Sequence, residues 1–327
     1  MKQREFGNNG FTTSEIGLGT WQLGGSDWGD VDDHSALQTL KTAVDKNITF
    51  IDTADVYGLG HSEQLIGKFL KQAGNKVTIA TKLGRYPEPG GDANFSLDTF
   101  RSHTEASIQR LGVDCIDLMQ LHCIPTEQLQ KGDVFDWLRE LQQEGKIRHF
   151  GVSVETVEEA ELCLQQDGVA SLQVIFNIFR QKPIGFFEKA KDKGVALIVR
   201  LPLASGLLSG KLTKNSTFAE NDHRNFNREG QLFNIGETFA GLPFEKGVAL
   251  SNELKSYVPD NMTLPQMALR WILDFDAVSV VIPGASHPAQ VQQNAEVSKL
   301  PPLDKKLHQQ LKLFYEKEVA EHIQGVY

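Results

Sequence analysis

Residues 49–82 read TFIDTADVYGLGHSEQLIGKFLKQAGNKVTIATK, and this stretch shows the unit from which the chain is built. Its two ends, Thr49–Asp52 and Val77–Lys82, are short apolar runs that predict strands. Between them, Ser62–Leu70 has apolar residues at three- and four-residue spacing, which predicts an amphipathic helix. A strand, a helix and a second strand in this order predict two parallel strands joined by a helical crossover.

The same alternation continues outward from this unit in both directions. Further strands are predicted at Glu15–Gly19, Ile116–His122, His149–Ser153, Leu172–Ile175, Val195–Leu201 and Val278–Ile282. Further helices are predicted at His34–Lys46, Leu97–Leu111, Val134–Glu144, Thr156–Gln166 and Ile184–Lys193. Eight such units in an α/β protein favour a closed (β/α)8 barrel over an open doubly wound sheet, and no GxGxxG fingerprint follows the first strand.

Two segments fall outside the alternation. Lys2–Phe11 precedes the first barrel strand and predicts a short N-terminal hairpin or arm. A polar stretch over residues 211–238 follows the seventh strand, before helical patterns at Phe244–Tyr257 and Leu264–Leu273. Structureless loops beyond about 12–15 residues are usually functional or disordered, so we expect a mobile lid here.

Composition limits the class of protein. The 327 residues suit one barrel of roughly 250 residues with insertions, so we expect a single domain over residues 1–327. A net charge of −9 without a basic tract argues against nucleic-acid binding. The cysteines, Cys115, Cys123 and Cys163, form no CxxC pair and the histidines are scattered, so neither a disulfide framework nor a metal site is expected. No secretory signal and no membrane span is evident; we expect a cytoplasmic protein, of undetermined oligomeric state.

Four reactive side chains come at or just after successive strand ends. Asp52, Lys82 and His122 close strands two, three and four, and Tyr57 follows Asp52 by five residues. Active sites of such barrels lie at the carboxyl ends of the strands. Each residue alone has an ordinary explanation: a helix cap, a solvated lysine or a structural histidine. Together they favour a catalytic site.

The chemistry of this set is specific. A free phenol has a pKa of about 10, and a lysine cation beside it stabilises the phenolate and eases proton donation. Asp52 would keep Lys82 charged, and His122 would orient a substrate oxygen. Such a set protonates a carbonyl oxygen while a hydride is added to the carbon.

The chain resembles the aldo-keto reductases over nearly its whole length. The motifs are GLGTWQ (17–22), FIDTADVYG (50–58), LGVDCIDLMQLH (111–122), GVS (151–153), LPLASGLLSGK (201–211) and VVIPGASHPAQVQQN (280–294). The resemblance implies a (β/α)8 barrel that transfers hydride between NAD(P)H and aldehydes, ketones or sugars. It also implies a catalytic tetrad of Asp52, Tyr57, Lys82 and His122, with Tyr57 as general acid. Parts of the chain also resemble the branch that includes potassium-channel β subunits.

The cofactor contacts follow from the same resemblance. Ser153 and Gln173 would hold the nicotinamide carboxamide, although Val154 stands where an Asn is usual. The loop around the pyrophosphate would use Leu203, Ser205, Gly206, Leu208, Gly210 and Lys211. The adenosine 2′-phosphate would lie near the start of a helix at Pro288, where free amides attract anions. The residues matched there are Gly284, Ser286, Gln290 and Asn294, with Arg224 from the lid.

Two features bear on specificity. Members with Lys or Arg in that turn have a cationic partner for the 2′-phosphate; here Arg224 would replace it, which favours NADPH over NADH. Arg200 stands where many members have an aromatic residue. It would favour the reduced cofactor, recognise an anionic substrate, or point away to a structural carboxylate. Trp21 and Trp28 would line the substrate opening or only pack there.

The sequence therefore predicts an NADPH-dependent reductase of a small aldehyde or ketone. An NAD(P)-dependent sugar dehydrogenase is an alternative, because the 2′-phosphate site has few cations. A sensor or partner subunit that binds the cofactor with weak catalysis is the other. The substrate depends on variable loops, and the sequence does not identify it.

Overall fold

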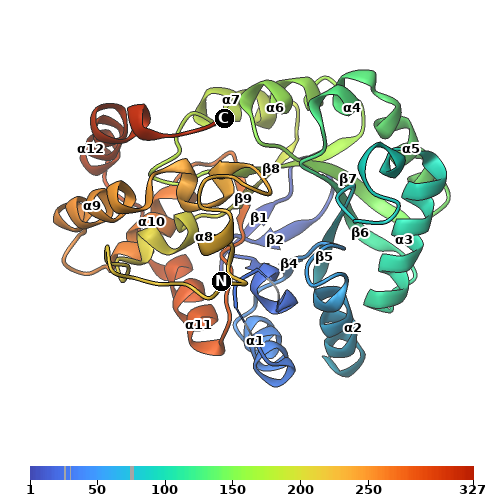
Figure 1. Ribbon diagram of the computed structural model, residues 1–327, viewed down its shortest axis with the longest axis horizontal. Coiled ribbons are helices and arrows are strands. Elements are labelled where there is room, and N and C mark those ends of the chain that lie inside the picture. The colour runs from blue at the N-terminus through green and yellow to red at the C-terminus, as the bar shows by residue number, and fades with distance from the viewer. Residues whose placement is uncertain (26, 30, 74–76) are drawn as a thin grey trace.

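The computed structural model describes residues 1–25, 27–29, 31–73 and 77–327. Eight parallel strands follow one another around a sheet in the order of the chain (Figure 1). They are β3 (Leu18–Gly19), β4 (Phe50–Asp52), β5 (Thr78–Leu83), β6 (Ile116–His122), β7 (Ile147–Ser153), β8 (Val169–Ile175), β9 (Ala196–Arg200) and β10 (Val278–Val281). Parallel bridges from Ile16 to Val281 and from Gly19 to Gly284 join the first strand to the last. The predicted (β/α)8 barrel is confirmed.

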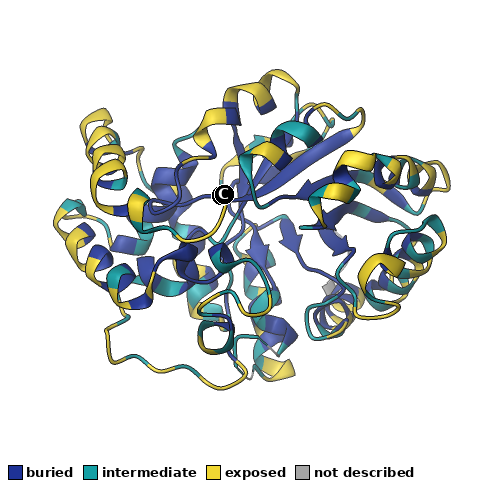
Figure 2. Ribbon diagram, turned by 45° about the horizontal axis from the view of Figure 1, so that its top comes forward, coloured by how far each residue is buried: buried dark blue, intermediate teal, exposed yellow. Residues whose placement is uncertain are grey.

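Helices cover the outside of the sheet. They are α1 (Asp33–Asp45), α2 (His61–Ala73), α3 (Leu97–Leu111), α4 (Thr126–Lys131), α5 (Asp133–Gln143), α6 (Val157–Cys163), α7 (Ile184–Asp192), α9 (Phe244–Leu254), α10 (Leu264–Leu273), α11 (Pro288–Glu296) and α12 (Lys305–Phe314). Several begin at a side-chain cap, as where Asp32 accepts from the Ser35 amide. Figure 2 shows buried strands inside helices whose outer faces are exposed. No helix of the described residues is both long and apolar enough to cross a membrane.

The N-terminal hairpin closes one end of the barrel. Its strands, β1 (Gln3–Glu5) and β2 (Thr12–Ser14), pair antiparallel, which confirms the predicted hairpin. Phe6 from its turn is fully buried among inward-facing barrel residues and stacks on Phe50 with ring centroids 5.7 Å apart. The carboxyl ends of the strands, at the other end of the barrel, are left for the site.

The long segment after β9 carries short helical turns, although a polar loop was expected. The turns are Ala204–Ser209, α8 (His223–Phe226), Ile235–Glu237 and Phe239–Gly241. The segment reaches the first βα loop, where the His223 amide donates to the Asp27 carbonyl at 2.8 Å and Trp28 bridges to Asp222. It therefore covers the carboxyl ends of the strands, as a lid would.

Candidate active site

A buried lysine links the predicted catalytic residues. Asp52 ends β4, Lys82 comes just before the end of β5, and Tyr57 lies on the loop after β4. The Lys82 Nζ donates to Asp52 Oδ1 at 2.5 Å, to the Thr53 carbonyl at 2.8 Å and to the Tyr57 hydroxyl at 3.3 Å. The three donors of the ammonium group thus all have acceptors, which is what a buried cation requires.

Two amides hold the other oxygen of Asp52. Gln173 Nε2 donates to Asp52 Oδ2 at 2.7 Å, and Gln120 Nε2 donates to it at 3.1 Å. Gln173 also donates to Gln120 Oε1 at 3.2 Å, so its amide group serves the carboxylate here. Sequence reasoning did not name Gln120. The signal that could have found it is an amide residue inside the apolar run of β6, where Gln120 is buried.

Burial and charge set the protonation of the site. Burial raises the pKa of Tyr57 to about 12, against the lowering effect of the Lys82 charge. Burial would lower the pKa of Lys82, but Asp52 and Tyr57 hold it above its usual value. For His122, burial and then the cations Arg85, Lys82 and Arg200 place the pKa well below its usual value. The site thus combines a protonated phenol, a charged lysine and a neutral imidazole.

His122 completes the group at the end of β6. Its ring meets the Tyr57 ring edge-on, with centroids 5.8 Å apart and an interplanar angle of 84°. Its Nδ1 is buried and has no hydrogen-bond partner within the described part of the chain. The four predicted catalytic residues are therefore brought together on one rim, as expected from successive strand ends.

A cavity of about 690 Å³ opens beside this rim. Its lining includes Tyr57, His122 and many of the residues predicted to bind the cofactor. Those that line it are Gln173, Arg200, Leu203, Ser205, Gly206, Lys211, Arg224, Gly284, Ser286 and Gln290. The remaining four, Ser153, Leu208, Gly210 and Asn294, lie outside its lining. Ser153 is buried and accepts from the Cys123 thiol at 3.3 Å, and Leu208 is part of the core.

The far part of the cavity offers donors suited to a dinucleotide. Helix α11 begins at Pro288 as predicted, and the Ser286 amide and hydroxyl both donate to Gln290 Oε1, at 2.8 and 3.2 Å. Gln290 thus accepts from the donors that an anion at this helix N-terminus would use. Gly206 has a φ of 98°, which favours glycine, and a Cβ there would lie 3.6 Å from Arg224. The residues present thus fit a nicotinamide dinucleotide, because glycine leaves the backbone at this position open beside the lid arginine.

Arg224 is held at the edge of this cavity. Its Nε and Nη2 donate to the two oxygens of Asp222 at 2.9 and 2.6 Å. Its guanidinium also lies over the rings of Trp28 and Phe218, 4.7 and 4.4 Å from their centroids. Stacking and a bidentate carboxylate fix a planar guanidinium in orientation. The predicted lid arginine is therefore fixed in orientation at the wall of the cavity.

The two predicted substrate-side tryptophans line the cavity and also pack beneath the lid. Trp21 stacks on Tyr57 with centroids 5.9 Å apart, and its Nε1 donates to Asp27 at 2.8 Å. His223 of the lid lies against both rings, with centroids 4.8 Å from Trp21 and 4.5 Å from Trp28. Both interpretations of these residues, as lining and as packing, thus hold.

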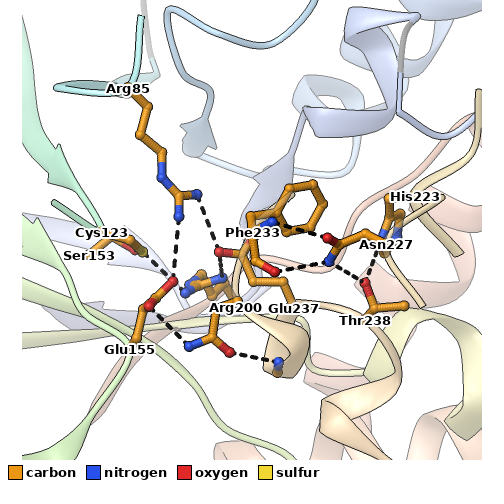
Figure 3. Close-up of polar contacts among 12 residues, drawn as sticks. Arg85, Cys123, Ser153, Glu155, Arg200, His223, Asn227, Phe233, Glu237 and Thr238 are labelled. Carbon is orange, nitrogen blue, oxygen red and sulfur yellow. Dashed lines mark hydrogen bonds and ion pairs between the residues drawn. The ribbon is translucent and has the colours of Figure 1, made fainter. Parts of the chain in front are cut away.

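Arg200 joins a charged network that sequence reasoning missed (Figure 3). Its guanidinium lies 3.5 Å from Glu237 and donates to the Cys123 sulfur at 3.3 Å. Arg85 pairs with the same Glu237 at 3.3 Å and with Glu155 at 3.4 Å. The structural carboxylate expected for Arg200 is therefore present, yet Arg200 does not point away, because it lines the cavity with Arg85 and Glu237.

The fold and the site together define an oxidoreductase that uses a nicotinamide cofactor. A model of the aldo/keto reductase family matches residues 15–316, and the chain belongs to this family. It is 31% identical over 304 residues to the aldo-keto reductase YhdN of Bacillus subtilis, covering 91% of this chain and 89% of that protein. It is 30% identical to the NADH-specific methylglyoxal reductase of Escherichia coli, with 90% and 92% covered. The aldo-keto reductase AKR11C1 from Bacillus halodurans, in its holo form, superimposes with a TM-score of 0.78 at 26% identity, over 100% of this chain and 98% of that one.

Proposed function

We propose that the chain is an NADPH-dependent reductase that converts a small aldehyde or ketone to an alcohol, with Tyr57 as the general acid. The observation that carries this proposal is the hydrogen-bonded series from Asp52 through Lys82 to Tyr57, buried beside a cavity. A phenol, an ammonium group and a neutral imidazole at one rim can together protonate and orient a carbonyl oxygen while its carbon accepts a hydride. The cytoplasmic location remains a prediction from the sequence.

When bound, the reduced nicotinamide supplies the hydride. Tyr57 donates its hydroxyl proton to the carbonyl oxygen, and Lys82, 3.3 Å from that hydroxyl, stabilises the phenolate that remains. Asp52 fixes Lys82 in place and keeps the ammonium group charged. His122, neutral because of burial, orients the carbonyl oxygen by a hydrogen bond without competing as an acid.

The preference for NADPH rests on the lid and on the start of α11. Arg224 and Lys211 line the cavity from the lid side, and Ser286 offers an amide and a hydroxyl. A 2′-phosphate would gain charge-assisted hydrogen bonds from such groups. The turn itself has no lysine or arginine, and one relative is named as an NADH-specific reductase, which supports NAD(H) as the alternative cofactor. The NAD(P)-dependent sugar dehydrogenase is the second candidate.

The first experiment follows NADPH oxidation by absorbance with 4-nitrobenzaldehyde, methylglyoxal, pyridoxal and a sugar aldehyde. Turnover that collapses in Tyr57→Phe would support the reductase and its acid. The ratio of kcat/KM with NADPH to that with NADH decides the cofactor, and alcohol oxidation with NAD would favour the dehydrogenase. Tight cofactor binding without turnover in either direction would instead favour a sensor or partner subunit. If neither cofactor binds, the proposal is wrong.

A further inference from the structure

The charged network beside the catalytic residues contains two guanidinium groups that lie close together. Arg85 comes from the loop after β5 and Arg200 from the end of β9. Both pair with the same oxygen of Glu237, Arg85 at 3.3 Å and Arg200 at 3.5 Å. A single carboxylate oxygen thus bridges two cations at the wall of the cavity, as Figure 3 shows.

The ion pairs that these guanidinium groups make with carboxylates of the protein are long. The pairs of Arg85 and Arg200 with carboxylates measure 3.3–3.5 Å, longer than the 2.7–2.9 Å or so of strong charge-assisted hydrogen bonds. The Nε of Arg200 is buried and has no partner among the described residues. Parts of both side chains stay accessible, 27% for Arg85 and 11% for Arg200, and both line the cavity, so a ligand there would meet their outer donors.

The two guanidinium groups of the network favour an anion over a metal cation as a ligand. The ligand atoms of Cys123, Glu155 and Glu237 lie within 4.8 Å of one another, but the two guanidinium groups beside them disfavour a metal cation. Burial and the neighbouring Glu237 raise the pKa of Glu155, whereas Arg200 and Arg85 overcome burial and lower the pKa of Glu237. Glu237 is therefore the carboxylate that the two guanidinium groups hold most firmly in its ionised form.

The network also lies within electrostatic reach of the reacting groups. Burial is the main cause of the low pKa of His122, and the charges of Arg85 and Arg200 lower that pKa further. Both arginines also line the cavity with Tyr57. A small molecule whose carbonyl oxygen meets Tyr57 and His122 would present its remaining atoms to this wall. The guanidinium pair is thus placed to contact a second functional group of the substrate.

We propose that Arg85 and Arg200 make the site selective for small aldehydes or ketones that also carry a carboxylate. The two guanidinium groups bind the carboxylate while the carbonyl oxygen meets Tyr57, and this assignment rests on the reductase function proposed above. A planar carboxylate matches the fork of a guanidinium group, and its charge would be shared by the two cations.

The test compares matched anionic and neutral substrates on the cofactor-loaded enzyme. One pair is 4-formylbenzoate and 4-formylbenzamide, and the other is succinic semialdehyde and 4-oxobutanamide. We expect the wild type to prefer the anionic member of at least one pair by about tenfold or more in kcat/KM, as charge-assisted hydrogen bonds allow. Arg85→Gln removes most of that preference, mainly through KM, and Arg85→Lys retains part of it.

Arg148→Gln is the matched control, because Arg148 pairs with Asp117 on the outside of the barrel and is exposed. This variant should keep the wild-type ratio of kcat/KM for the anionic substrate to kcat/KM for the neutral one. A second readout does not need turnover: benzoate should bind the NADPH-loaded wild type by calorimetry, and at least tenfold more weakly after Arg85→Gln.

Three results would overturn the assignment: a wild-type ratio near one for both pairs, an equal loss on anionic and neutral substrates in Arg85→Gln, or benzoate affinity that does not depend on Arg85. Failure of the reductase function gives a different result, because no carbonyl compound would then turn over with either cofactor. The benzoate measurement would still decide whether Arg85 binds a carboxylate.

Discussion

Lys82 Nζ lies 2.5 Å from Asp52 Oδ1, and the two side chains are only 1% and 3% exposed. A buried ion pair stabilises little in net terms, but loss of one partner leaves an uncompensated buried charge. The pair therefore constrains both the folding and the chemistry of this site, and its two roles can be separated by substitution.

Lys82→Met should lower the free energy of unfolding by about 3–5 kcal/mol, because it leaves the Asp52 carboxylate buried without its cation. The double variant Asp52→Asn/Lys82→Met should be more stable than Lys82→Met alone, since no buried charge remains. Urea unfolding at pH 7 measures both. A loss below about 1 kcal/mol for Lys82→Met would show that solvent or another group replaces the lysine.

Tyr57→Phe should lower kcat for carbonyl reduction by about 10²–10⁴-fold, the usual contribution of a positioned general acid. The Kd for NADPH, measured by fluorescence, should change by less than about threefold, because the loss falls on the reacting step. The fold should be kept, since Lys82 still has Asp52 and Thr53 as acceptors. An equal loss in cofactor affinity and in kcat would argue for a structural role instead.

The pH dependence of reduction should be flat over the neutral and alkaline range. Burial raises the pKa of Tyr57 to about 12, so the phenol keeps the proton that it must donate. Between pH 7 and pH 10, kcat should vary by less than about threefold, although a free phenol loses half of its protons at about pH 10. A one-proton decline centred at pH 9 or below, in a kcat profile with saturating NADPH, would contradict this expectation.

Acid should destabilise the fold through the lid histidine. Burial lowers the pKa of His223 to about 4, so the unfolded chain takes up a proton below about pH 6.5 while the folded chain does not. Between pH 7 and pH 5 this single group should cost about 2 kcal/mol of unfolding free energy. His223→Gln should remove that share of the decline, and exposed His34→Gln should not. Parallel urea titrations at the two pH values compare them.

Arg224→Gln tests the cofactor preference. If Arg224 contacts the 2′-phosphate, the Kd for NADPH should rise by about tenfold while that for NADH changes by less than about twofold. Arg228→Gln is the control, because Arg228 is the next lid arginine and lies 5.0 Å from the Phe244 ring centroid. An equal rise in the Kd for NADPH and in the Kd for NADH would assign Arg224 to the pyrophosphate or to lid packing. The proposed preference for NADPH would then lose its support.

The fold was largely predictable from the sequence because the pattern was long and periodic. Ile116–His122, Leu97–Leu111 and Leu264–Leu273 were predicted with the bounds that the structure has. The first strand was predicted as Glu15–Gly19 but is Leu18–Gly19, because Ile16 makes only an isolated bridge to the last strand. Strand ends depend on which neighbour completes the ladder, and that is a tertiary property.

The part of the site that lies at or near strand ends could be predicted from the sequence. The four predicted catalytic residues lie at or just after strand ends. Arg85 and Glu155 also come two or three residues after a strand-end side chain, so the same reasoning could have found them. Glu237 could not be found in this way. It reaches Arg85 and Arg200 only because of the path that the lid takes over the barrel, and no local pattern specifies that path.

The hairpin around Phe6 has a consequence for how molecules travel. Because this aromatic side chain and its neighbours fill the amino-terminal end of the barrel, the cavity of the described residues is closed on that side and lies beneath the lid. A molecule that binds in this cavity therefore does not enter or leave through the hairpin end of the barrel. If the release of one ligand from this cavity is slow, it delays the binding and release of any other ligand that shares the same route.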